Sequence, residues 1–205
     1  IMTVRKAPAS RVLAARPDLD QLRRQAKELL AAFRSGDEDA IAEVRARYRN
    51  VDPAAFALHD AQLVLARSYG FDSWPKLKTY VDGATVRRLV DAVRANDFPA
   101  VEALIDARPE LANMEVAGDD EHRAIQHAVL VRSPEMVRLL MRRGADARRG
   151  IYPHRDATSA LVIAHDRGYD EIVAIIREEE AKRRPTREAE TGTADPPAGE
   201  LTAAV

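Results

Sequence analysis

The chain has 205 residues, of which 46% are hydrophobic, and its 32 Lys and Arg against 33 Asp and Glu leave a net charge of −1. This balance excludes a strong overall attraction for nucleic acid or an anionic membrane, and the lack of cysteine excludes disulfides, thiolate nucleophiles and cysteine-based metal sites. The lack of cysteine also favours a reducing compartment, so we expect a cytoplasmic protein, and no apolar run approaches the roughly 20 residues of a membrane span. The abundance of Ala and Arg is compatible with a bacterial source.

The N-terminal part of the sequence predicts a flexible arm and then a helix. Residues 1–16 lack periodicity and are expected to form the arm. Asp18 with Gln21 three positions later has the arrangement of a capping box, and Gly36 is placed to end the helix that follows. A second helix is expected from about Asp37 to a turn at 52–53.

Two more helices complete a four-helix module over residues 17–83. Asp60 is placed to cap the third helix, which Gly70 ends, and Ser73 is placed to cap the fourth. A turn at residues 82–83 is expected to close the module. The inner side of the fourth helix is expected to carry Trp74, Leu77, Tyr80 and Val81.

Residues 84–183 repeat with a fixed period. Ala92, Ala128 and Ala164 occupy equivalent positions in three similar segments and are 36 residues apart each time (128 − 92 and 164 − 128). Each segment predicts two short helices and a connecting loop. Because such short helices are unstable alone, their apolar faces must be buried against the neighbouring unit.

The residues after the repeats, 184–205, are rich in Pro, Thr, Gly, Glu and Ala and carry few large apolar groups. They predict a disordered tail or a linker. A linker would make this chain the regulatory or targeting portion of a larger multidomain enzyme, and that alternative stays open at this point.

The repeating segments resemble ankyrin repeats. The stretch from Glu135 to Asp146, ending in Gly-Ala-Asp, is similar to the second helix and loop entry of that family, and residues 167–173 are similar to its glycine turn. Residues 108–113 match a variant loop of such repeats, and residues 17–83 are similar to helical modules that precede them in bacterial proteins. The resemblance implies an all-α, ankyrin-like helical solenoid preceded by a small four-helix module. It also implies a protein–protein interaction scaffold with no enzymatic activity and no cofactor.

Two departures from the ankyrin pattern lead to specific expectations. The first-helix Thr-Pro-Leu-His signature is replaced by residues 123–126 (Arg-Ala-Ile-Gln) and 159–162 (Ser-Ala-Leu-Val), so its hydrogen bonds are expected to be partly or wholly absent. The turn glycine remains as Gly168, but Asn96 and Arg132 stand at the other two turns. Because arginine adopts the left-handed conformation poorly, the second turn is expected to differ.

The candidate binding residues lie in the second unit and in the loop after it. Leu130 and Val131 stand where the ankyrin pattern has polar, groove-facing residues, so they predict an exposed apolar patch, unless the N-terminal module or the 147–158 loop covers them. The residues predicted to contact a protein partner are Leu130, Val131, Arg148, Arg149, Tyr152, His154 and Arg155.

Nucleic acid or phosphate is a less favoured partner. Its candidate site is the Arg-rich stretch 142–155, where Tyr152 could stack on a base beside Arg142, Arg143, Arg148, Arg149, His154 and Arg155. Asp146 and Asp156 lie in the same stretch, and arginines near helix C-termini also favour the helix dipole.

No metal or catalytic site is predicted. The spacings of His122, His127, His154 and His165 follow no recognised ligand pattern, and the acidic run 119–121 is more typical of a solvated loop than of a cation site. The serines lack a glycine elbow or a partnered histidine, so no catalytic residue is nominated.

Overall fold

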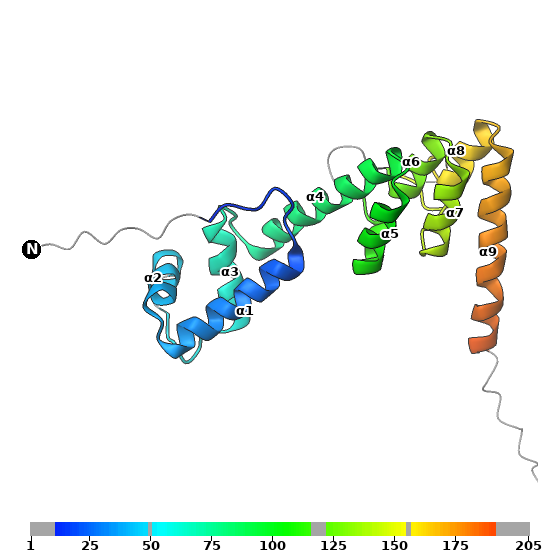
Figure 1. Ribbon diagram of the computed structural model, residues 1–205. Coiled ribbons are helices and arrows are strands. Elements are labelled where there is room, and N and C mark those ends of the chain that lie inside the picture. The colour runs from blue at the N-terminus through cyan, green and yellow to red at the C-terminus, as the bar shows by residue number, and fades with distance from the viewer. Residues whose placement is uncertain (1–10, 49–50, 116–121, 155–156, 192–205) are drawn as a thin grey trace, which may run out of the picture. The chain divides into compact units, whose positions relative to one another are not determined.

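The computed structural model describes residues 11–48, 51–115, 122–154 and 157–191, with side chains up to residue 183 (Figure 1). Every regular element within these ranges is a helix, which confirms the all-α prediction for this part of the chain. Contacts divide the chain into an N-terminal unit, which ends at Arg88, and a C-terminal unit, which begins at Leu89. None of the helices in these ranges is long and apolar enough to cross a lipid bilayer.

The N-terminal unit is built on three helices that contact one another: α1 (Leu19–Ser35), α2 (Glu38–Arg47) and α3 (Leu58–Ser68). The expected start of α1 is confirmed, because Asp18 Oδ1 accepts a hydrogen bond from the Gln21 N–H at 2.7 Å. Its expected end is also confirmed, since Gly36 has φ +85°. One core of this unit consists of Leu29, Phe33, Ala40, Val44, Phe56, Ala61 and Val64.

Three expectations for the third and fourth helices are wrong. α3 begins after Ala57, and Asp60 lies inside the first turn, where its carboxylate accepts the Ala57 N–H at 2.9 Å. The turn expected at residues 82–83 does not form, because α4 (Trp74–Arg94) continues through it. Asp82 is satisfied within the helix by Lys78 at 2.6 Å, and a single glycine costs a helix only about 1 kcal/mol relative to alanine. Tyr80, expected on the inner side, is 52% exposed.

The flexible arm expected over residues 1–16 is attached to the unit from Arg11 onward. The Arg11 N–H donates to the Ser68 carbonyl at 2.9 Å, and its guanidinium pairs with Glu43. The prediction of a flexible arm rested on the lack of local periodicity, which does not reveal contacts with residues distant in the sequence. Residues 1–10 lie outside the described residues.

The C-terminal unit is made of helical hairpins. After the end of α4 come α5 (Phe98–Ala107), a 3₁₀ turn η1 (Pro109–Asn113), α6 (Ala124–Leu130), α7 (Pro134–Arg142), α8 (Ala160–Asp166) and α9 (Asp170–Thr191). α6 contacts α7 and α8, and α9 contacts α7 and α8, so the equivalent helices of the second and third hairpins pack on one another (Figure 1). The buried residues that fill this packing include Val101, Ile105, Leu111, Ile125, Met136, Leu140, Met141, Ile172 and Ile176.

The last helix is longer than the sequence pattern predicts. α9 continues through Pro185 to Thr191, so the non-helical tail expected from residue 184 does not begin there. The first half of α9 is held by α7 and α8, and a helix that is already nucleated extends readily through Arg, Glu and Ala. Residues 192–205 lie outside the described residues.

The same left-handed turn closes helix after helix. Among the described residues, φ is positive at Gly36, Gly70, Asn96, Arg132, Gly144 and Gly168. At the three turns that are 36 residues apart, the N–H groups of Asp97, Ser133 and Tyr169 donate to the carbonyls of Ala92, Ala128 and Ala164 at 2.9, 3.0 and 2.9 Å. This is the bond pattern of the Schellman motif, and it gives the period seen in the sequence a physical cause.

The second turn does not differ from the other two, so that expectation is wrong. Arg132 has φ +54°, close to the +53° of Asn96. Its guanidinium lies 5.1 Å from the centre of the Tyr169 ring in the next unit. Such a cation–π contact is worth about 0.5–1 kcal/mol at an exposed site, which offsets part of the cost of about 1–2 kcal/mol for a left-handed arginine.

Two glycine-to-alanine substitutions should have opposite effects. A Cβ at Gly144 would meet no atom within 4 Å, but φ is +92°, so Gly144→Ala should lower the free energy of unfolding by about 1–2 kcal/mol through backbone strain alone. Gly83 lies inside α4, where a Cβ would meet only Arg87 Nη2 at 3.7 Å, so Gly83→Ala should raise it by about 0.5–1 kcal/mol. Both changes in the free energy of unfolding can be measured by urea denaturation monitored by circular dichroism. Two changes of the same sign would contradict the left-handed conformation of Gly144 or the helical conformation of Gly83.

Candidate partner-binding surface

The loop at residues 147–158, between α7 and α8, carries most of the predicted binding residues. Thr158 closes it: its Oγ1 accepts the Ile151 N–H at 2.6 Å and lies 2.8 Å from the His154 carbonyl oxygen, to which it can donate. Between these points Tyr152, Pro153 and His154 are exposed, and Tyr152 is 74% exposed. An aromatic side chain therefore stands at the tip of a loop whose two sides are hydrogen-bonded to each other.

Arg123 holds the base of this loop. Its Nη1 donates to the carbonyls of Arg149 and Gly150, both at 3.2 Å, while its Nε donates to the Asn113 carbonyl at 3.1 Å and its Nη2 pairs with Glu115. The residue is 3% exposed. Because hydrogen bonds from a buried cation are stronger than neutral ones, one side chain fixes two successive loops of the C-terminal unit.

Gln126 adds a second connection to the same loop. Its Oε1 accepts the Arg123 N–H at 2.6 Å, and its Nε2 donates to the Thr158 carbonyl at 2.6 Å. Gln126, at the histidine position of the altered signature, therefore makes two hydrogen bonds in the second unit. In the third unit, Ser159 Oγ accepts the Val162 N–H at 3.3 Å.

The preceding loop is tied to the Gly-Ala-Asp segment by Asn113. Its Nδ2 donates to the Gly144 carbonyl and its Oδ1 accepts the Asp146 N–H, both at 2.8 Å. The two hydrogen bonds join Asn113 to residues that lie 31 and 33 positions later in the chain. The loop entry of one hairpin is thus positioned by the loop of the hairpin before it.

The predicted binding residues do not form one patch. Val131 is 37% exposed and Leu130 is half-buried, and both stand at the C-terminal end of α6. The 147–158 loop is bonded to the opposite end of α6, and a helix of that length spans about 10 Å. Arg155 lies outside the described residues, so its placement is not part of this surface.

Most of the basic residues of the loop region are engaged in ion pairs. Arg148 makes two hydrogen bonds to the Glu180 carboxylate, at 2.7 and 2.8 Å, and this contact raises the pKa of Arg148 above its ordinary value. Arg142 pairs with Glu179 at 3.4 Å, and Arg143 pairs with Glu102 and Asp106 of α5. Arg149 is exposed and makes no side-chain ion pair within the described part of the chain. Fewer arginines of this stretch are therefore free to bind a phosphate than the sequence predicted.

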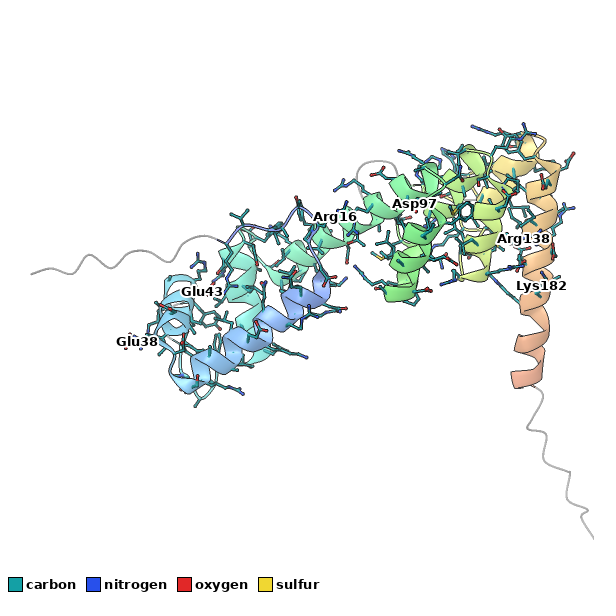
Figure 2. All side chains as sticks on the ribbon, in the orientation of Figure 1. Arg16, Glu38, Glu43, Asp97, Arg138 and Lys182 are labelled. Atoms are coloured by element: carbon teal, nitrogen blue, oxygen red, sulfur yellow. The ribbon has the colours of Figure 1, made fainter. Side chains whose placement is uncertain are left out.

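A network of charges joins α7 to α9. Arg138 contacts Glu178 at 2.9 Å and Glu179 at 3.3 Å, and Lys182 contacts the same carboxylates at 2.6 and 3.0 Å (Figure 2). Hydrogen bonds from Lys182 and Arg138 lower the pKa of Glu178 to about 2. Burial alone would raise the pKa of Glu179, but Lys182, Arg142 and Arg138 together bring it below its ordinary value.

No three potential metal ligands lie together in the described ranges. The rings of His122 and His127 are 5.7 Å apart, and His127 is buried while His122 is partly so. The acidic run 119–121 lies outside the residues that the structure describes.

The sequence identified the exposed tip of the loop but not the residues that hold it. Arg123, Gln126 and Thr158 form the supporting bonds, and the visible signal was a long cationic side chain at a position where the ankyrin pattern has threonine. That signal does not identify the acceptors, because they are backbone carbonyls distant in sequence.

Comparison with known proteins gives no match: no family model, no curated protein sequence and no solved structure is significantly similar to the chain. Its function is therefore inferred from its own residues.

Removal of the Thr158 hydroxyl should open the loop without unfolding the unit. We expect Thr158→Val to speed hydrogen exchange of the Ile151 amide by about 10-fold, since a hydrogen bond of about 1.4 kcal/mol is lost. NMR-detected exchange measures this rate. Thr79→Val, at an exposed position of α4, should leave it unchanged. An Ile151 amide that already exchanges at the unstructured rate in the unsubstituted chain would contradict the closed loop.

The α7–α9 network should stabilise the fold only where Glu178 is ionised. Because folding lowers its pKa from 4.5 to about 2, its contribution is present above pH 4.5 and is lost as the pH falls toward 2. We expect Glu178→Gln to lower the unfolding temperature at pH 7, and this effect should become small as the pH falls to 2 and vanish below it. Glu171→Gln, at an exposed position of the same helix, should have a smaller effect at pH 7. A Glu178→Gln effect that is independent of pH would contradict the network.

Proposed function

We propose that residues 84–183 form three ankyrin-like repeats and that this chain is a non-enzymatic scaffold that binds a protein partner. The proposal is supported by turns of one conformation 36 residues apart, by the contacts between equivalent helices and by the Gly144-Ala145-Asp146 loop entry. Stacked repeats of this kind bury their apolar faces between units and present loops and inner helices to partners.

The observation that carries the proposal is the exposed Tyr152 on a loop held by Thr158 and Arg123. A tyrosine supplies a large contact area with few rotatable bonds, and aromatic residues are common among those that dominate binding energy. Because the loop is already fixed, little conformational entropy is lost when a partner covers it. Tyr152 is therefore the anchor we assign, with Pro153, His154 and Arg149 around it.

Leu130 and Val131 supply a second, apolar contact at the other end of α6. Val131 is one of only a few large hydrophobic side chains that are exposed in the described residues. A partner that touches both Tyr152 and Val131 would run along α6. The half-buried Leu130 supports the edge of this contact rather than its centre.

The ion pairs of this surface make it a poorer candidate for binding nucleic acid or phosphate than the arginines in the sequence indicated. Arg142, Arg143 and Arg148 are each paired with a carboxylate of the same chain. A phosphate would have to compete with those carboxylates, and the chain as a whole has a net charge of −1.

Capture experiments with the tagged full chain test the proposal. We expect Tyr152→Ala and Val131→Asp each to reduce the captured protein partner by about 10-fold or more, the loss of roughly 1.4 kcal/mol that a central contact carries. The unfolding temperature should barely change in Tyr152→Ala, because Tyr152 is 74% exposed, and should fall slightly in Val131→Asp, because Val131 is only 37% exposed.

Tyr80→Ala is the matched control, since Tyr80 is also an exposed tyrosine but belongs to α4. If the Tyr152→Ala chain captures as much partner as the unsubstituted chain, Tyr152 is not the anchor of the interface. Captured nucleic acid that is released steeply with salt would instead support the phosphate alternative.

A further inference from the structure

Residues 11–17 cross the N-terminal unit as a segment without helix or strand, which we call the strap. It is attached at three points. The Arg11 N–H donates to the Ser68 carbonyl at 2.9 Å, Leu13 packs on the core cluster, and Pro17 is buried. The side chain of Val12, between the first two points, is 88% exposed. The core cluster on which Leu13 packs consists of Leu19, Leu22, Ala66, Leu77 and Val81.

The guanidinium of Arg11 is bound by residues of α2 and α3. Glu43 of α2 accepts two hydrogen bonds from the guanidinium, at 2.9 and 2.8 Å, and its side chain is 15% exposed (Figure 2). The buried Ser68 hydroxyl of α3 lies 2.7 Å from the same carboxylate. With Arg11 in place, both carboxylate oxygens of Glu43 accept from one guanidinium, and this bidentate, charge-assisted contact favours an arginine from whatever chain supplies it.

The strap is loosely packed between its attachment points. A hollow of about 140 Å³ separates it from α1 and is bordered by Leu13, Gln21, Leu22, Gln25 and Tyr69, among others. The contacts therefore concentrate on Arg11, on the apolar Leu13 two positions later and on the buried Pro17. Few further interactions hold the segment down.

We propose that the strap occupies, from within the chain, a groove for extended peptides of the form Arg-x-Leu, in which Glu43 and Ser68 bind the arginine and the core cluster receives the leucine. The ligand class is an extended protein segment with this spacing, and it must displace the strap to bind. The strap continues directly through the N-cap Asp18 into α1, so it is held beside the groove and keeps it largely closed in the resting chain.

The full-length chain with the strap weakened tests this groove. The probe is a fluorescein-labelled heptapeptide with the sequence of residues 11–17, with blocked termini, and binding is followed by anisotropy. We expect it to bind the Arg11→Ala/Leu13→Ala chain at least 10-fold more tightly than the unsubstituted chain. Adding Glu43→Gln should abolish that binding, and so should aspartate in place of the peptide's leucine.

Circular dichroism establishes that each variant is folded. Should the double variant fail to fold, Arg11→Lys replaces it, because a lysine cannot make the bidentate contact, and a several-fold gain in peptide binding over the unsubstituted chain is expected. No binding by the folded variant, or equal binding with and without Glu43→Gln, would overturn the proposal. This groove lies in the N-terminal unit and is independent of the Tyr152 surface, so failure of one leaves the other standing.

Discussion

The hydrogen bond that closes each left-handed turn is the interaction on which the C-terminal unit depends. At each turn of the 36-residue series, the amide after the left-handed residue donates to the carbonyl of an alanine, and the chain then enters the next helix at a fixed angle. The same alanines mark the sequence period. Because α6, α7 and α8 are each too short to be stable alone, the turn must orient every hairpin so that its apolar side meets the next one. Arg132 adopts the same left-handed conformation although this is costly for arginine, and its contact with the Tyr169 ring of the next unit offsets part of the cost.

A second layer of polar contacts links the hairpins on the side of the loops. Asn113 bonds to the Gly-Ala-Asp segment of the next hairpin, and Arg123 and Gln126 bond to the loop after that. Arg123 and Gln126 stand at two positions of the altered first-helix signature. Arg123 satisfies the buried Gly150 carbonyl, which would otherwise cost about 1–3 kcal/mol. The consequence for function is local rigidity. Tyr152 is exposed on a loop whose base is part of this network, so the part of the surface best suited to binding is also held by the fold.

What the sequence could predict followed from local chemistry. Asp18, Gly36, Gly70 and Gly168 occupy the caps and turns expected of them, and the period located every hairpin of the C-terminal unit. The errors came from interactions between distant residues. Arg11 is held by Glu43, 32 positions away, and Arg132 is stabilised by a ring in the following unit. Residues 82–83 read as a turn, but their neighbours favour a helix strongly enough to keep one glycine in it. At the candidate surface, exposure of Tyr152 was predictable, whereas the carbonyls that Arg123 would reach were not.

The central claim is that the three turns are one structural device and that their hairpins pack as a cooperative set. Native-state hydrogen exchange of the Asp97, Ser133 and Tyr169 amides tests it most directly, because each of these N–H groups makes the bond that closes its turn. Cooperative stacking predicts that all three amides are protected and that they open together, with similar free energies of exchange. Rapid exchange of the Ser133 amide, with the other two still protected, would show that the Arg132 turn is open and would contradict the claim.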